Sequence, residues 1–143
     1  MMSKILSARP GEQEVSAIMD IPPALTSRAL FWKAQFLEEA AILPHLPLLF
    51  WLVDCVRPSL IVSLGLKDGV GHFAMCQAVD KLDLASICLG YETREAAKSQ
   101  VAKRLKDHND AHFDHISQLF ALPVEAALGR IGDGRVDLCL IEI

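Results

Sequence analysis

The stretch LIVSLGLKDGVGH, residues 60–72, decides the fold. Its first five residues form a short aliphatic run, which is typical of a strand buried on both faces of a parallel sheet. Gly65, Gly69 and Gly71 follow, just before a predicted helix. Glycine lets the backbone approach a ligand closely, and the first amides of a helix are free to donate hydrogen bonds. The stretch therefore predicts a strand, a glycine loop and a helix, arranged to bind a nucleotide-like cofactor.

The glycine spacing alone leaves this interpretation open. It matches neither the GxGxxG dinucleotide fingerprint nor the GxxxxGK[ST] phosphate loop, and Lys67 lies outside the latter context. Three glycines in this position also suit a tight turn between a strand and a helix with no ligand at all.

Strands and helices continue to alternate towards the end of the chain. We expect further strands at residues 87–91, 115–120 and 136–141, and helices at residues 94–106 and 123–128. Such a βαβαβαβ series predicts the α/β class: a Rossmann-like, doubly wound, mostly parallel sheet of about four strands. Its ligand crevice is expected beyond the carboxyl ends of the strands.

Two helices are expected before the first strand. The first follows a cap at Thr26 or Ser27 and has apolar positions at four-residue and three-residue spacing from Leu30 to Ala41. The second covers residues 48–56 and stops before Pro58. We therefore expect an N-terminal helical segment at residues 1–45, and the first half of a Rossmann-like domain at residues 46–143.

The chain ends on its fourth predicted strand, with no following helix or strand. This pattern favours a truncated domain whose missing cover comes from elsewhere. The two alternatives are a missing C-terminal half and a homodimer that buries residues 48–53 or the last strand.

Composition limits the function classes further. The 143 residues are 52% hydrophobic and 22% charged, with a net charge of −4 and no basic stripe, so we expect one folded domain that does not bind nucleic acid. Prolines interrupt the longest uncharged stretch, residues 40–53, so no membrane span is predicted. The first residues lack the apolar centre of a signal peptide, which favours the cytoplasm. The four cysteines occur singly along the sequence, so we expect reduced, buried thiols and neither disulfides nor a zinc site.

Two carboxylates are expected at the rim of the crevice. Glu92 follows the second predicted strand, where an acidic side chain can accept both hydroxyl protons of a ribose. It can equally favour the positive end of the next helix. Glu142 ends the last strand and points to the same rim, unless it is a solvated chain end.

These residues resemble the class I S-adenosylmethionine-dependent methyltransferases. Ser63 to Gly71 is similar to the first motif of that family, acidic-x-Gly-x-Gly-x-Gly. The segments at residues 45–65, 69–84, 106–113 and 133–143 extend the resemblance to about 100 of the 143 residues. They resemble a bacterial group of methyltransferase domains that is associated with glycosyltransferases of polysaccharide biosynthesis.

The resemblance implies S-adenosylmethionine as cofactor and assigns roles within the crevice. Glu92 would hold the ribose, and Ala121 and Leu122 would flank the adenine. The methionine part would be lined by Gly65, Lys67, Asp68, Gly69 and Gly71. Ser63 and Glu142 occupy the positions of the two acidic residues of the family and are counted with the cofactor contacts. No residue is assigned as catalytic base.

Three hypotheses about function follow. The first is a methyltransferase domain, possessing its cofactor site but only part of an active site. The second is a degenerate, noncatalytic Rossmann-like module for interaction or oligomerisation, which Ser63, Glu142 and the early end favour. The third is another nucleotide-binding domain that uses the same glycine loop.

Histidines provide a further candidate site. His108, His112 and His115 would share one face of a helix and could bind a metal there with Asp110 or Asp114. The adjacent Asn and Asp favour a solvated loop instead, so no metal is predicted. His72 follows the glycine loop and is expected to be a hydrogen-bonded residue at the helix start rather than a ligand contact.

Overall fold

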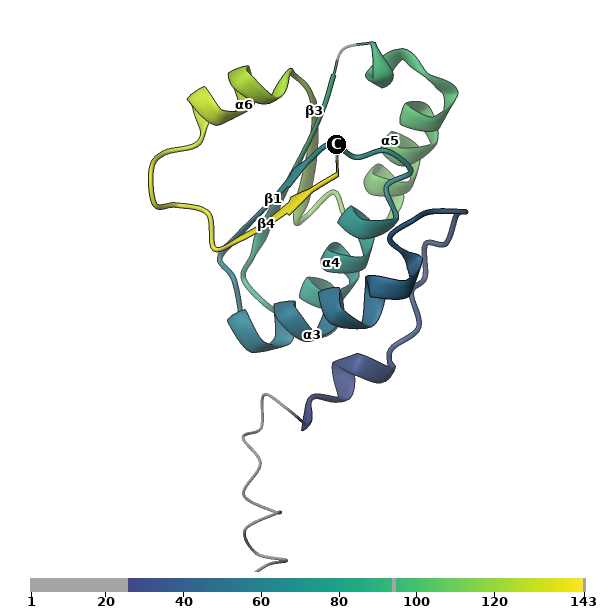
Figure 1. Ribbon diagram of the computed structural model, residues 1–143, viewed down its shortest axis with the longest axis vertical. Helices are drawn as coiled ribbons and strands as arrows, with labels where there is room; N and C mark the ends of the chain where they lie inside the picture. The colour runs from purple at the N-terminus through teal and green to yellow at the C-terminus, as the bar shows by residue number, and fades with distance from the viewer. Residues whose placement is uncertain (1–25, 94, 143) are drawn as a thin grey trace, which may run out of the picture.

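The computed structural model describes residues 26–93 and 95–142 of the chain. Their centre is a four-stranded sheet in the order β3-β2-β1-β4, with all three strand pairs parallel (Figure 1). The strands are β1 (Leu60–Leu64), β2 (Ile87–Glu92), β3 (Ser117–Ala121) and β4 (Leu138–Ile141). The predicted α/β class and Rossmann-like parallel sheet are thus confirmed.

Helices connect the strands on both faces of this sheet. The α-helices are α3 (Leu46–Val56), α4 (Val70–Lys81), α5 (Gln100–His112) and α6 (Val124–Arg130). Short 3-10 helices are η2 (Arg28–Phe31), η3 (Leu43–His45) and η4 (Ala96–Lys98). No helix in the described part of the chain is long and apolar enough to cross a membrane.

The strand order places a reversal in the middle of the sheet. The chain moves from β1 outward through β2 to β3, and then crosses back to pair β4 with the other side of β1. Ser63 in β1 therefore lies opposite Gly90 in β2 and Leu140 in β4. In open α/β sheets, ligands bind beyond the carboxyl ends of the strands at such a reversal. The fold thus predicts a ligand site at the loop after β1.

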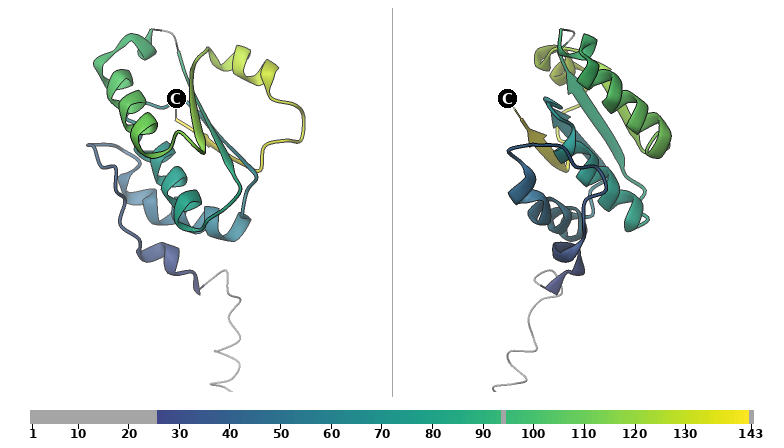
Figure 2. Two further views of the ribbon diagram at one scale, coloured as in Figure 1. Left: turned by 180° about the vertical axis from the view of Figure 1, so that it is seen from behind. Right: turned by 90° about the vertical axis from the view of Figure 1, so that its right-hand side faces the viewer.

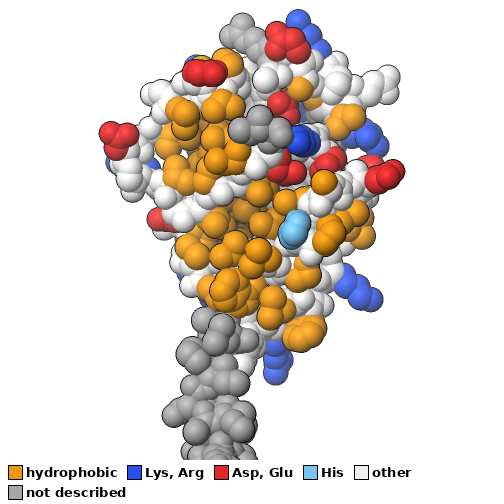
Figure 3. Space-filling model, in the orientation of Figure 1, with side chains coloured by type: hydrophobic (Ala, Val, Ile, Leu, Met, Phe, Trp, Pro, Cys, Tyr) orange, Lys and Arg blue, Asp and Glu red, His pale blue; other side chains and the backbone are white. Residues whose placement is uncertain are grey.

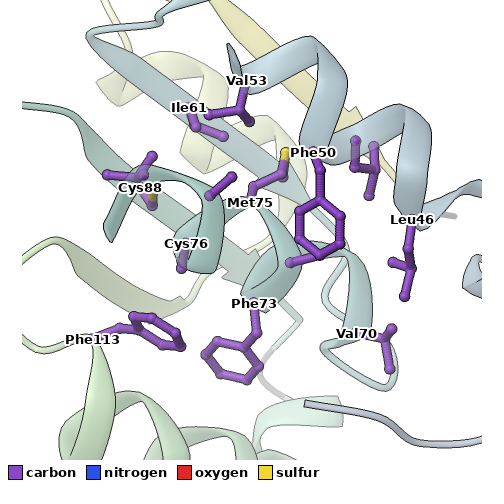
Figure 4. Close-up of a cluster of buried hydrophobic side chains, with 14 of the residues drawn as sticks. Leu46, Phe50, Val53, Ile61, Val70, Phe73, Met75, Cys76, Cys88 and Phe113 are labelled. Carbon is purple, nitrogen blue, oxygen red and sulfur yellow. The ribbon is translucent and has the colours of Figure 1, made fainter. Parts of the chain in front are cut away.

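The main core lies between the sheet and helices α3 and α4. Four buried residues of α3 recur at helical spacing and face α4: Leu46, Leu49, Phe50 and Val53. Helix α4 is buried from Val70 to Val79, because α3 and the sheet enclose it. Figure 4 shows Phe50, Met75 and Phe73 in this core. This packing fixes α4, and with it the end of the glycine loop.

The opposite face of the sheet has less cover. There α6 packs its buried Ala127 near Val62, Leu64 and Tyr91. Figure 2 shows α6 apart from α4 and α5, across the strands. Hydrophobic side chains gather over α6 and the neighbouring sheet in Figure 3, and Ile141 of β4 is 57% exposed.

The helix predicted from Leu30 to Ala41 is wrong beyond its first turn. Ser27 does cap η2, by accepting a hydrogen bond from Ala29 N at 3.1 Å. After η2 the backbone bonds to a distant side chain instead of to itself. Gln77 accepts from Gln35 N and donates to Lys33 O, both at 2.8 Å. Because these backbone groups already have hydrogen-bond partners in Gln77, folding this segment into a helix would only replace those bonds. Residues 1–25 of the predicted N-terminal segment lie outside the described residues.

The helix predicted at residues 94–106 starts later and runs further. It begins at Gln100, because Ser99 caps it by accepting from Ala102 N at 3.1 Å. It continues to His112 through residues that we predicted as a loop. Asn109 does not form a turn in this stretch, because its side chain is buried and donates to Ser117 O at 3.1 Å. Arg94 lies outside the described residues.

The end of α3 and the burial of the cysteines were also predicted from the sequence. Helix α3 ends at Val56, before Pro58 as expected, with Arg57 in the left-handed region at φ +50°. Cys76 and Cys88 are buried as predicted, whereas Cys139 is exposed. Burial alternates along β4, and Cys139 is one of its two exposed residues.

Candidate functional site

A cavity of about 940 Å³ lies at the carboxyl end of β2 and β3 and continues beside α5. Lys67, Glu92 and Ala121, all predicted from sequence, contribute to its wall. They come from the glycine loop, the end of β2 and the end of β3. The structure therefore brings together three of the predicted residues that are far apart along the chain.

Glu92 braces the glycine loop. Its Oε2 accepts hydrogen bonds from Leu66 N at 3.0 Å and from Lys67 N at 3.1 Å, while its Oε1 accepts from Thr93 N at 2.9 Å. A carboxylate has about four lone-pair sites, so roughly one acceptor site remains for a ligand hydroxyl. Lys67 has φ +48°, a left-handed conformation that this pair of bonds helps to hold. Leu66, which the sequence did not single out, belongs to the site through its backbone amide.

Gly65 has the least space of the loop glycines. It adopts φ +79°, and a Cβ added there would overlap the carbonyl oxygen of Glu142. The close approach is fixed on both sides, since Gly65 N donates to Tyr91 O and Glu142 N donates to Leu64 O, each at 2.9 Å. Only glycine fits both the conformation and the space.

Gly69 and Asp68 begin helix α4. Gly69 adopts φ +82° at the N-cap, and its N–H donates to Leu66 O at 2.7 Å, which closes the loop as a tight turn. Asp68 Oδ1 accepts from Val70 N at 3.0 Å. It thereby satisfies one of the amides that open the helix, and its carboxylate favours the positive helix end.

Glu142 lies against Gly71. A Cβ on Gly71 would come within 2.7 Å of Glu142 Oε1, so this glycine leaves room for the carboxylate. Burial raises the pKa of Glu142, and the negative charge of Asp68 raises it further, against a lowering by Lys67. The two carboxylates and Lys67 thus share one electrostatic environment at the loop, as the sequence suggested for Glu142.

Ser63 lies beneath the loop and not in the cavity. Its side chain is fully buried, and its Oγ is 2.9 Å from His72 Nδ1. The other ring nitrogen of His72, Nε2, is 2.9 Å from Ser117 Oγ. This buried chain of three side chains links β1, α4 and β3. His72 is therefore a hydrogen-bonded core histidine, and Ser63 supports the loop from below.

We expect His72 to make folding sensitive to acid. Burial lowers its pKa from 6.5 to about 4. The unfolded chain consequently takes up a proton that the folded chain refuses, so stability is lost as pH falls from about 6.5 towards 4. Linkage gives a loss of about 2 kcal/mol between pH 7 and pH 5 from this group. Urea unfolding at both pH values measures it.

A matched pair of variants assigns the acid effect to one residue. His72→Gln should remove the histidine part of the pH dependence, at the expense of overall stability. His115→Gln, at an exposed residue 3.2 Å from Asp80, should leave it intact. An unchanged pH dependence in the His72 variant would refute this assignment.

Ala121 and Leu122 separate at the end of β3. Ala121 contributes to the cavity wall, while Leu122 packs with the cluster under α6. The two residues thus lie on either side of the strand end and do not form one surface.

The sequence did not identify the α5 wall of the cavity. That wall includes Val101, Leu105 and Asn109. The signal was present, because the apolar spacing of Ala97, Val101 and Leu105 reaches Asn109 after four more residues. The adjacent Asn and Asp hid it by favouring a loop.

The histidine cluster does not form a metal site. The rings of His108 and His112 lie 4.6 Å apart on α5, but His115 lies beyond the helix. Within residues 26–93 and 95–142 no group of three His, Cys, Asp or Glu side chains is placed to hold a metal ion. His108 packs instead against the rings of Phe36 and Phe73.

No family model matches the chain. An uncharacterized protein, y4gI of Sinorhizobium fredii, is 33% identical over 113 residues. The match covers 75% of this chain and 12% of that protein, so the chain corresponds to a small part of a much longer relative.

Solved structures define the class of fold. The SAH-bound methyltransferase PaMTH1 of Podospora anserina superposes with a TM-score of 0.59 at 16% identity, covering 96% of this chain and 61% of its own. Cofactor-bound Rv0187 from MTB gives 0.58 at 16% identity, covering 94% and 61%. The chain therefore has the Rossmann-like fold of these proteins and spans about three fifths of their length.

Proposed function

We propose that this chain binds S-adenosylmethionine at the carboxyl edge of its sheet and forms the cofactor-binding part of a methyltransferase. The bracing of the glycine loop by Glu92 carries this proposal. It joins the loop after β1 to an acidic residue at the end of β2, the two features expected for a nucleoside with a ribose. The fold shared with an SAH-bound methyltransferase supports it.

The residues present fit such a cofactor. Three backbone N–H groups of the described residues donate to Glu92, which leaves roughly one acceptor site for a ribose hydroxyl, and Ala121 lies at the adjoining end of β3. The glycine loop would face the methionine part through Lys67, Gly69 and Gly71. The cofactor supplies an electrophilic methyl group, and the protein mainly holds the acceptor in line with it.

The residues do not favour one particular acceptor. Glu142 has a raised pKa at the rim, and the charges of Asp68 and Lys67 act on it, but this does not select one class of acceptor. Sugar hydroxyls, and a link to polysaccharide biosynthesis, follow from the sequence resemblance alone. A cytoplasmic location is proposed on different grounds, namely that the first residues lack the apolar centre of a signal peptide.

A homodimer also belongs to the proposal. It would cover apolar side chains that α3 and β4 expose, including Leu48 at 49% and Ile141 at 57%. A noncatalytic module would use the same surface, so this feature does not separate the two functions. Cofactor binding does.

Titration calorimetry with S-adenosylhomocysteine tests the proposal. We expect saturable binding to the 143-residue chain with one site. Gly69→Trp should abolish it, because the new side chain would start against Leu105 and Phe73 and displace the loop.

Gly134→Trp is the matched control. Gly134 also has a positive φ, +67°, but a Cβ there meets nothing within 4 Å. This variant carries a similar backbone strain away from the loop and should bind normally. No heat of binding to the folded wild-type chain at millimolar ligand would refute the proposal and favour the noncatalytic module.

A further inference from the structure

A groove between α5 and β3 extends the cavity away from the glycine loop. We call it the α5–β3 groove. It is lined by Val101, Ala102, Leu105, Asn109, Ser117 and Leu119. Most of these side chains are apolar, and α5 itself buries only Leu105 and Asn109. The helix therefore stands beside the strand without closing over it.

The strand that borders this groove has an open edge. β3 is the outermost strand on its side of the sheet, and no other described strand lies beside it. Ile116 O accepts from Cys88 N at 2.8 Å, so the backbone groups of residues 116, 118 and 120 point to β2. Backbone groups alternate in direction along a strand, so those of Ser117, Leu119 and Ala121 point outward. All three residues line the cavity. Ser117 N already donates to Phe113 O, and Ser117 O accepts from Asn109 Nδ2, so the open edge consists of Leu119 and Ala121.

Asn109 adds an unused acceptor to the groove. Its residue is only 4% exposed. Its Nδ2 donates to Ser117 O at 3.1 Å. Because the carbonyl oxygen of Ser117 can only accept, the NH₂ group of the Asn109 amide must face it, and this fixes the orientation of the amide. Its Oδ1 then receives no hydrogen bond from any described residue. A buried acceptor without a partner costs roughly 1–3 kcal/mol, which a ligand donor would recover.

From these features we infer that the α5–β3 groove binds an extended peptide segment of a partner protein, which adds a strand to β3. The inference does not rest on the proposed cofactor function, although the groove belongs to the same cavity and shares Ala121 with the proposed cofactor site. The bonds would run between the peptide backbone and the outward groups of Leu119 and Ala121. A further peptide N–H would donate to Asn109 Oδ1.

An extended backbone suits the groove better than a compact ligand. It offers alternating donors and acceptors, as an open strand edge requires, and places every second side chain on one face. Those side chains would contact Val101, Ala102 and Leu105 of the helix. The open edge runs from Leu119 to Ala121, which matches a segment of about three residues at ~3.3 Å each. The partner segment should therefore carry apolar residues at alternate positions.

Selection of peptides tests this inference without a known partner. A phage-displayed library of random nonapeptides is panned against the full chain, and enriched sequences are synthesised with a fluorophore. We expect them to share alternating apolar residues and to bind by fluorescence anisotropy. Failure to enrich any nonapeptide that binds the free chain would overturn the inference.

Methylation of the peptide backbone then tests the mode of binding and leaves the protein unchanged. Two versions of the best peptide carry N-methyl groups at alternate positions, one set on odd and one on even residues. In strand addition only one set of N–H groups faces β3. One version should bind at least ~10-fold more weakly, since it loses hydrogen bonds of about 1 kcal/mol each, and the other should retain most of its affinity. Equal effects of the two versions would contradict strand addition.

Variants of the chain locate the site. Ala102→Phe should fill the groove, and Asn109→Leu should remove the acceptor; each should weaken peptide binding at least ~10-fold. Lys103→Leu, on the same helix but outside the cavity wall, is the matched control. Circular dichroism shows that each variant is folded before it is used. Unchanged affinity in folded Ala102→Phe would place the peptide elsewhere and overturn the inference.

Discussion

Gly65→Ala should destabilise the chain by about 3 kcal/mol or more, the largest effect that we expect for any single methyl group. Two costs combine. A non-glycine residue at φ +79° costs roughly 1–2 kcal/mol. The new Cβ would also overlap the carbonyl oxygen of Glu142, which is backbone and cannot rotate away. The end of β4 must then move and lose the bond from Glu142 N to Leu64 O, or the loop must move.

Urea unfolding of Gly65→Ala and Gly134→Ala measures this effect. Gly134 has a similar positive φ, +67°, without any atom within 4 Å of the added Cβ. Its variant should lose only about 1 kcal/mol. The difference between the two variants isolates the contact with Glu142. Equal losses would mean that backbone conformation alone explains the glycine, and that the loop and β4 do not meet as described.

Glu92→Gln should weaken S-adenosylhomocysteine binding at least ~10-fold and lower stability by about 2 kcal/mol. The carboxylate accepts three backbone hydrogen bonds, including those from Leu66 N and Thr93 N. Hydrogen bonds to a charged group contribute about 1.5–3 kcal/mol each. An amide in its place turns one acceptor into a donor that faces backbone N–H groups. The loop then loses its brace, and the ribose loses its acceptor.

Glu95→Gln is the control for Glu92→Gln. Glu95 is exposed and close to Glu92 along the chain, and its substitution by Gln removes the same charge. Calorimetry should show normal affinity for this variant. If both variants bind alike, the charge at the rim matters only through its long-range field, and Glu92 has no direct part in the site.

The strands could be predicted from the sequence because local patterns determine them. Aliphatic runs at residues 60–64 and 87–91 leave few alternatives to buried parallel strands. Residues 30–41 show why other segments could not be predicted. Their spacing is helical, but Gln77, more than 40 residues away, binds the backbone of Lys33 and Gln35. A tertiary contact of this kind overrides a local pattern and leaves no trace in it.

The candidate site divides in the same way. Glu92 could be found from the topology inferred from sequence, because it stands at a strand end, whereas Ala121 came from the family resemblance; both residues line the cavity. The burial of Ser63 depends on the partner that its side chain meets, His72, and this required the structure. Asn109 was missed, because the Asn-Asp pair favours a loop, and only the structure shows that its Oδ1 has no hydrogen-bond partner among the described residues.

Amide NMR spectra recorded during a titration with S-adenosylhomocysteine test most directly whether the loop after β1 binds the cofactor. We expect the signals of Leu66, Lys67 and Thr93, whose N–H groups Glu92 holds, to shift together and saturate at one affinity. Signals of α3, on the far side of α4, should stay in place. Saturable shifts confined to α3, or spectra that do not change, would contradict a cofactor site at the carboxyl edge of the sheet.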